Sequence, residues 1–157
     1  MSTQTATKSK SNAVVEGLQT LLADSYALMA QTHLAHWNVE GPAFFSLHTA
    51  FQTQYEELFA AVDEIAERLR ALDVLAPGGL KTLATASRIE ELAVETTPAK
   101  DFVAHLIDCH EITVADAHVV REAAEESDDL ETQDLVIARI QAHQKTLWML
   151  KSFLKNL

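Results

Sequence analysis

Four residues between positions 36 and 67 have the chemistry of metal ligands: His36, His48, Asp63 and Glu67. Neutral imidazoles bind transition metals, and a mixed set of imidazole and carboxylate ligands suits ferrous iron. Asp63 and Glu67 are four residues apart, so a helix would place them on one face. His48 lies fifteen residues before Asp63, which is about 22 Å along a straight helix with a rise of ~1.5 Å per residue. Ligands of one ion lie about 2 Å from it, so the histidines and the acidic pair cannot share an ion on one straight helix.

Two interpretations of these four residues follow. In the first they are unrelated: the histidines pack or lie on the surface, and the acids form an ordinary solvated helix face. In the second a copy of the chain completes the site. If a helix over residues 45–72 packs antiparallel on its own copy near Tyr55–Leu58, the His48 end of one chain meets the Asp63 and Glu67 end of the other. A two-fold contact of this kind makes two identical sites, so the spacing predicts a symmetric dimer with metal in its interface.

A di-iron centre inside one subunit is not expected. Such a centre in a helical bundle needs a Glu-x-x-His pattern on two helices. The residue three positions before each of the seven histidines is not acidic in any case. This pattern directs any iron site toward an interface between chains.

The apolar spacing predicts four long helices that could position these ligands. Breaks fall at Gly41-Pro42, at Pro77-Gly78-Gly79 and at Ser127-Asp128-Asp129. Asn12 is expected to cap the first helix, and Thr97-Pro98 is a helix-start signal. A long second-to-third connection predicts an all-α four-helix bundle with one crossover, which is typical of ferritin-like folds. The long helices are predicted over residues 12–38, 45–72, 98–126 and 131–153, and a short helix in the crossover over Ala86–Glu95.

Length and composition predict one domain over residues 12–157, preceded by a polar, flexible tail over residues 1–11. The only cysteine, Cys109, excludes an internal disulfide and a cysteine-rich zinc site, and it fits a reducing cytoplasm. We interpret it as a buried packing residue rather than a nucleophile. No secretory signal or membrane span is expected. The net charge of −11 argues against a nucleic-acid groove and favours a surface that attracts cations, although ordinary solubility explains it equally well.

The sequence resembles the Dps family, the DNA-binding proteins from starved cells, also called miniferritins. The matching elements are His36-Trp37-Asn38, Gly41-Pro42, Phe44, His48 and Asp63-x-x-Ala66-Glu67-Arg68, and the resemblance extends to Trp148-Met149. It implies four-helix subunits in a hollow homo-dodecamer built from two-fold dimers. It also implies that Fe(II) is oxidised, usually by hydrogen peroxide, at sites shared across each dimer, and that ferric mineral is stored inside. Carried over by position, one subunit supplies His36 and His48, and its partner supplies the acidic pair at 63 and 67.

The resemblance also bears on residues around this site and at the far end of the chain. The family normally has an acidic ligand where this chain has Gln52, so we expect iron binding to survive and cooperative two-iron oxidation to weaken. Trp37 either packs in the core or, beside the metal site, absorbs stray oxidising equivalents. The acidic turn over residues 125–134 either caps a helix or, by resemblance, lines an iron entry pore with Asp129 and Asp134.

The leading hypothesis is therefore a cytoplasmic ferroxidase that stores iron and limits oxidative damage. The alternative is a protein that compacts DNA without sequence preference and has weak or lost ferroxidase activity, because Gln52 replaces an acidic ligand; it would associate with the nucleoid. DNA binding in this family often depends on lysine-rich tails, whereas this N-terminal tail has only Lys8 and Lys10, so DNA binding is expected to be weak. A third hypothesis, a shell without chemistry, is disfavoured by the intact set of four ligands.

Overall fold

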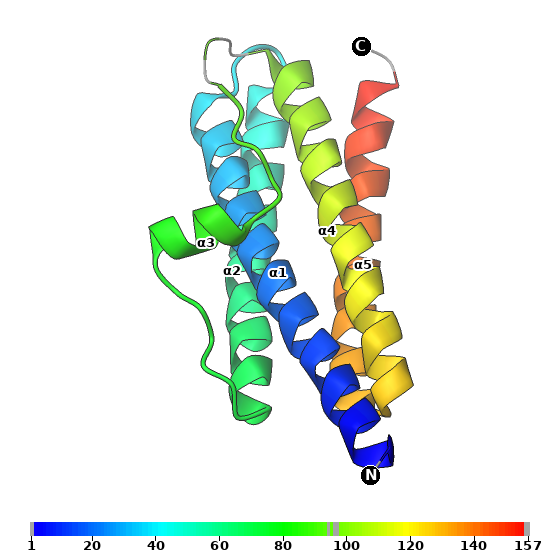
Figure 1. The fold of residues 1–157 in the computed structure, drawn as a ribbon. Coiled ribbons are helices and arrows are strands. Elements are labelled where there is room, and N and C mark those ends of the chain that lie inside the picture. Colours follow the sequence, from blue (N-terminus) through cyan, green and yellow to red (C-terminus); the bar gives the residue numbers. More distant parts are fainter. Residues whose placement is uncertain (1, 94, 96–97, 156–157) are drawn as a thin grey trace.

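The computed structural model of the chain describes the backbone of residues 2–93, 95 and 98–155, and side chains from residue 12 onward within these ranges. Four long helices form a bundle, and one short helix lies in the connection that crosses it (Figure 1). This confirms the predicted all-α bundle with a long crossover. The helices are α1 (Ser2–Asn38), α2 (Phe44–Ala71), α3 (Leu80–Ala86), α4 (Ala99–Ser127) and α5 (Leu130–Leu154).

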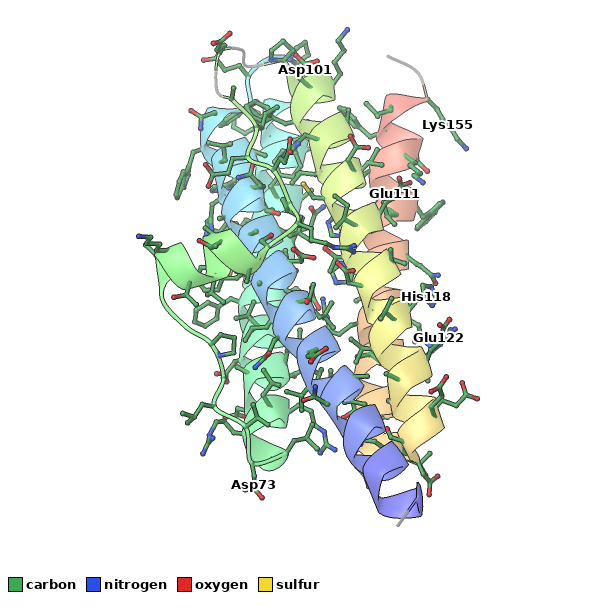
Figure 2. All side chains as sticks on the ribbon, in the orientation of Figure 1. Asp73, Asp101, Glu111, His118, Glu122 and Lys155 are labelled. Atoms are coloured by element: carbon green, nitrogen blue, oxygen red, sulfur yellow. The ribbon has the colours of Figure 1, made fainter. Side chains whose placement is uncertain are left out.

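The long helices form two antiparallel hairpins, α1 with α2 and α4 with α5 (Figure 1). Many residues are in contact within each hairpin and between α1 and α4, whereas far fewer residues of α2 and α5 contact each other. Asp73, just after α2, marks one end of the bundle, and Asp101 and Lys155 mark the other (Figure 2). The α1–α2 turn lies at the end marked by Asp101, so it is far from the acidic end of α2.

Apolar side chains fill the bundle in two clusters, one around Phe51 and Phe102 and one around Leu18 and Ile65. Full burial of such a side chain contributes roughly 1.5–3 kcal/mol. Gly17 belongs to the second region, and a Cβ at this position would lie only 2.8 Å from Cγ2 of Val120. The glycine therefore allows α1 to approach α4 closely without ending the helix.

The crossover carries a short helix, as predicted, but this helix lies at other residues than expected. A short helix was expected over Ala86–Glu95, but α3 ends at Ala86. The described residues between α3 and α4 are not helical. The reason is a competing set of hydrogen bonds: the buried carboxylate of Asp24 accepts from the Ser87 hydroxyl at 2.7 Å and from the Arg88 amide at 2.6 Å. These bonds hold the chain against α1 in an extended form. Arg88 also pairs with the buried Asp116 of α4, so one arginine fastens the crossover to two helices.

The first helix also starts earlier than predicted. Asn12 lies inside α1 and donates to Glu16 at 2.6 Å instead of capping the helix. The described backbone is helical from Ser2, where a flexible tail over residues 1–11 was expected. The sequence has no proline and no glycine before Gly17, so no residue type there forces a helix to begin at Asn12.

Cys109 is buried on α4, as predicted for a packing residue. Burial, with a smaller contribution from the nearby Asp108, raises the pKa of its thiol to about 12. Its sulfur lies 3.4 Å from Nε2 of His105. Within the described part of the chain, no helix is long and apolar enough to span a membrane.

Candidate functional site

His36 and His48 face each other across the turn between α1 and α2. Nδ1 of His36 donates to the backbone oxygen of His48 at 2.8 Å, and Nδ1 of His48 donates to the backbone oxygen of His36 at 2.9 Å. The two rings stack with centroids 3.7 Å apart and planes 19° apart. Because both Nδ1 atoms are used as donors to carbonyl groups, the neutral rings keep the lone pair on Nε2. This is the tautomer in which a histidine ligates a metal through Nε2, with its orientation fixed by the hydrogen bond at Nδ1.

The Gly41-Pro42 turn brings the two histidines together. Gly41 has a φ of +107°, a conformation that side-chain-bearing residues rarely adopt. The chain can therefore reverse within a few residues, and Phe44 stacks on the His48 ring at 4.9 Å. His36 is 8% exposed, so its ring is held within the fold of one chain.

Three aromatic side chains continue from this pair toward the surface. Tyr55 of α2 meets His36 edge-on at 5.2 Å and stacks on His33 at 4.1 Å. His33 in turn stacks on Trp37 at 5.3 Å. Burial lowers the pKa of His33, and the nearby His36 lowers it further. Trp37 is 69% exposed, so the interpretation that it packs in the core of its own subunit is wrong.

Asp63 and Glu67 lie one turn apart on the exposed side of α2, beyond its midpoint. They share a helix face, as the sequence predicts, and lie toward the end of α2 remote from His48. Among the described residues, no three His, Cys, Asp or Glu side chains come close enough to form a metal site within one chain. The structure thus brings the two histidines together and leaves the two acids apart from them.

Gln52 is exposed and lies one turn after His48. Its amide nitrogen donates to the Glu56 carboxylate at 2.8 Å. A carboxylate therefore lies beside the position where the resemblance implies an acid.

Asp129 and Asp134 occupy different environments. Asp129 is the N-cap of α5: its carboxylate accepts from the Thr132 amide at 3.0 Å and pairs with Arg68 at 2.8 Å. Burial alone would raise the pKa of this carboxyl, but the hydrogen bonds from Thr132 and the charge of Arg68 lower it. Asp129 therefore has the geometry of the capping interpretation, whereas Asp134 is exposed on α5.

A second polar cluster was missed by the sequence analysis. His110 of α4 and His143 of α5 are buried, with their Nδ1 atoms 2.9 Å apart. Nε2 of His143 lies 3.4 Å from the guanidinium of Arg139, which pairs with Glu57 of α2. Polar residues at positions that the helical spacing assigns to the core were the available signal, because buried polar groups need partners.

Known proteins resemble this chain in sequence over most of its length. Residues 15–157 match the family described as ferritin-like domain. A relative in Bacillus anthracis, named DNA protection during starvation protein 2, is 35% identical over 91% of this chain and 97% of its own length. A DNA protection during starvation protein of Brevibacillus brevis is 33% identical over 85% and 89% of the two chains.

Solved structures of Dps proteins also resemble this chain in fold. The X-ray structure of Dps from Thermosynechococcus elongatus matches with a TM-score of 0.91 and 30% identity, over 95% of this chain and 94% of that one. Dps from Vibrio cholerae O1, described as a member of a broad superfamily of ferritin-like diiron-carboxylate proteins, matches with a TM-score of 0.89 and 28% identity, over 94% and 92%.

Proposed function

We propose that the chain, which belongs to the Dps miniferritins of the ferritin-like family, is a ferroxidase. Membership of this family supports a role in iron storage and protection. Ferrous iron is its substrate, and hydrogen peroxide is the oxidant. Each site combines His36 and His48 of one subunit with Asp63 and Glu67 of a second copy. The observation that carries this proposal is the reciprocal hydrogen bonding of the two histidines, which leaves both Nε2 lone pairs available to iron.

The separation of the proposed ligands supports the two-fold arrangement. The histidines lie at the start of α2 and the acids lie beyond its midpoint, so antiparallel contact between two α2 helices brings unlike ends together. Such a contact is isologous and yields two equal sites per dimer. We further propose that six such dimers close into the hollow dodecamer that the family resemblance implies.

The proposed ligand set supplies a suitable charge for oxidation. Two carboxylates stabilise the ferric product more than the ferrous substrate, because the interaction grows with the charge on the metal. One hydrogen peroxide molecule takes one electron from each of two Fe(II) ions and, with two protons, becomes two water molecules. Pairing the two electrons in this way avoids release of hydroxyl radicals. The ferric ions then enter the stored mineral.

A ferrous binding experiment tests the proposal directly. Anaerobic Fe(II) is added to the parent protein and to an Asp63→Asn/Glu67→Gln variant, and peroxide follows. Rapid peroxide-dependent oxidation in the parent, lost in the variant, is the expected result. Equal and slow oxidation in both proteins would reject the ferroxidase proposal.

DNA binding is a second candidate function, favoured by the names of the starvation-protection relatives. The net charge of −11 opposes it, so any binding depends on the lysines of the N-terminal segment acting in many copies. A gel shift at low salt with and without residues 1–11 distinguishes the cases. We place the protein in the cytoplasm, with nucleoid association only if that shift is observed.

A further inference from the structure

A pocket of about 420 Å³ opens between α2 and α5, along the seam where the bundle helices meet least. Its lining includes His110, Gln54, Glu57 and Lys145. Two polar atoms on these side chains are fully buried and have no hydrogen-bond partner: Nε2 of His110 and Oε1 of Gln54. Buried polar groups are rarely left unpaired, so the pocket wall offers unused hydrogen-bonding capacity to a ligand.

The neighbouring residues fix which atom of His110 carries the proton. Arg139 has only donors, so Nε2 of His143, 3.4 Å from its guanidinium, must accept. His143 then carries its proton on Nδ1 and donates it to Nδ1 of His110 at 2.9 Å. His110 is therefore left with a proton on Nε2, the unpartnered atom at the pocket. The opposite arrangement would turn an N–H of His143 toward the N–H groups of Arg139.

Both histidines are neutral near pH 7. Burial, with a smaller contribution from the charge of Arg139, lowers the pKa of His110 to about 3. The pKa of His143 is also lowered by burial and by its two charged or titratable neighbours. An N–H donor without a free lone pair at Nε2 is a poor metal ligand and a good partner for an acceptor.

The charges around the pocket favour an anion as that acceptor. The carboxylate of Glu57 is held by both terminal nitrogens of Arg139, so its charge is compensated. Lys145 forms no ion pair with any described residue. The amide of Gln54 can present its NH₂ group in place of the orphaned oxygen after a half-turn. Three residues that line the pocket can then act as donors, and one of them, Lys145, carries an uncompensated positive charge.

We propose that this pocket binds a small oxyanion, a carboxylate or a phosphate, between Nε2–H of His110, the amide of Gln54 and the ammonium group of Lys145. The site lies on α2, α4 and α5 and uses none of the four proposed iron ligands. It therefore stands or falls independently of the ferroxidase proposal.

The test uses the assembled, iron-free full-length protein. Calorimetric titration with inorganic phosphate and, separately, with acetate distinguishes the two sources of the oxyanion. Lys145→Met should weaken binding at least about tenfold, since hydrogen bonds to charged groups contribute roughly 1.5–3 kcal/mol. Gln54→Leu should also weaken binding. Oε1 of Gln54 has no protein partner in the parent, so the substitution removes no hydrogen bond to protein at that atom. Lys151→Met is the matched control. It removes a lysine charge from the same helix, but Lys151 already pairs with Glu111.

Location of the anion provides a second measurement. Crystals soaked in selenate should show anomalous scattering next to Nε2 of His110, and the peak should be lost in Lys145→Met. Saturable binding of phosphate or acetate that weakens in Lys145→Met and Gln54→Leu but not in Lys151→Met supports the proposal. No saturable binding of either anion, equal binding in all variants, or a selenate peak elsewhere only would overturn it.

Discussion

A mixing experiment examines whether the proposed iron site is shared between two chains. One variant carries His36→Leu and His48→Leu, and the other carries Asp63→Asn and Glu67→Gln. Each variant alone lacks one half of every site, so neither should oxidise Fe(II) rapidly. Unfolding them together and refolding the mixture produces dimers with one chain of each kind.

The structure gives the size of the expected recovery. The two histidines lie together at the start of α2, and the acids lie on the same helix beyond its midpoint. A mixed dimer therefore has one site with both intact halves and one site with neither. Random pairing of equal amounts makes half of the dimers mixed, so about one quarter of the parental number of sites should return in a two-fold assembly.

Stopped-flow absorbance after peroxide addition measures these sites through the fast phase of Fe(II) oxidation. Size-exclusion elution must first show that both variants and the mixture assemble like the parent. The control mixture pairs the histidine variant with a chain carrying all four substitutions, and it should show no fast phase. No recovery in the first mixture, despite normal assembly, would refute a site shared across the two-fold axis.

Four further predictions concern other residues. Gln52→Glu should tighten binding of the second iron and speed the two-iron oxidation, and equal affinity and rate in parent and variant would contradict the role assigned to Gln52. The pKa values of His110 and His143 are lowered in the folded chain, so their contribution to stability is complete above pH ~6.5 and is lost as the pH falls below that value. At pH 5 this loss is up to about 2 kcal/mol for His110, and His143 adds to it in the same direction. Urea unfolding at pH 7 and 5 should show the loss in the parent, and a His110→Leu/His143→Leu variant should show a weaker pH dependence. Asp134→Asn should slow iron uptake if this exposed carboxylate guides cations through a pore, and unchanged uptake kinetics would reject that role. Asp129→Ala should instead lower the free energy of unfolding by about 1 kcal/mol through loss of the side-chain cap of α5, as measured by denaturation.

The bundle could be predicted from the sequence because its apolar residues recur at helical spacing over long stretches. Helix ends were predicted to within a few residues where glycine and proline mark them, as at Gly41-Pro42. The long crossover with a short helix was predicted correctly, but the position of that helix was wrong because a tertiary interaction decides the conformation after Ala86. Nothing in the sequence around Ser87 and Arg88 indicates that Asp24, more than sixty residues earlier, will bind their hydroxyl and amide groups.

In the candidate site too, features set by local geometry could be predicted from the sequence, and contacts between distant residues could not. The shared face of Asp63 and Glu67 follows from helix geometry alone. The reciprocal hydrogen bonds of His36 and His48 depend on how the turn folds, and spacing could not reveal them. His110 and His143 come from separate helices, so their contact depends on the packing of α4 against α5. Whether a second copy completes the iron site stays a prediction.

The burial of Cys109 has a consequence for a protein proposed to work with peroxide. Peroxide oxidises the thiolate form of cysteine, first to sulfenic acid and then irreversibly to sulfinic and sulfonic acids. With the pKa of Cys109 raised to about 12, only about one thiol in 10⁵ is ionised at pH 7, and the surrounding bundle limits access to it. The chain's single thiol is thus shielded from the oxidant, and turnover should leave it reduced. Alkylation of Cys109 can then report opening of the bundle, because a reagent reaches the sulfur only when α4 separates from its neighbours.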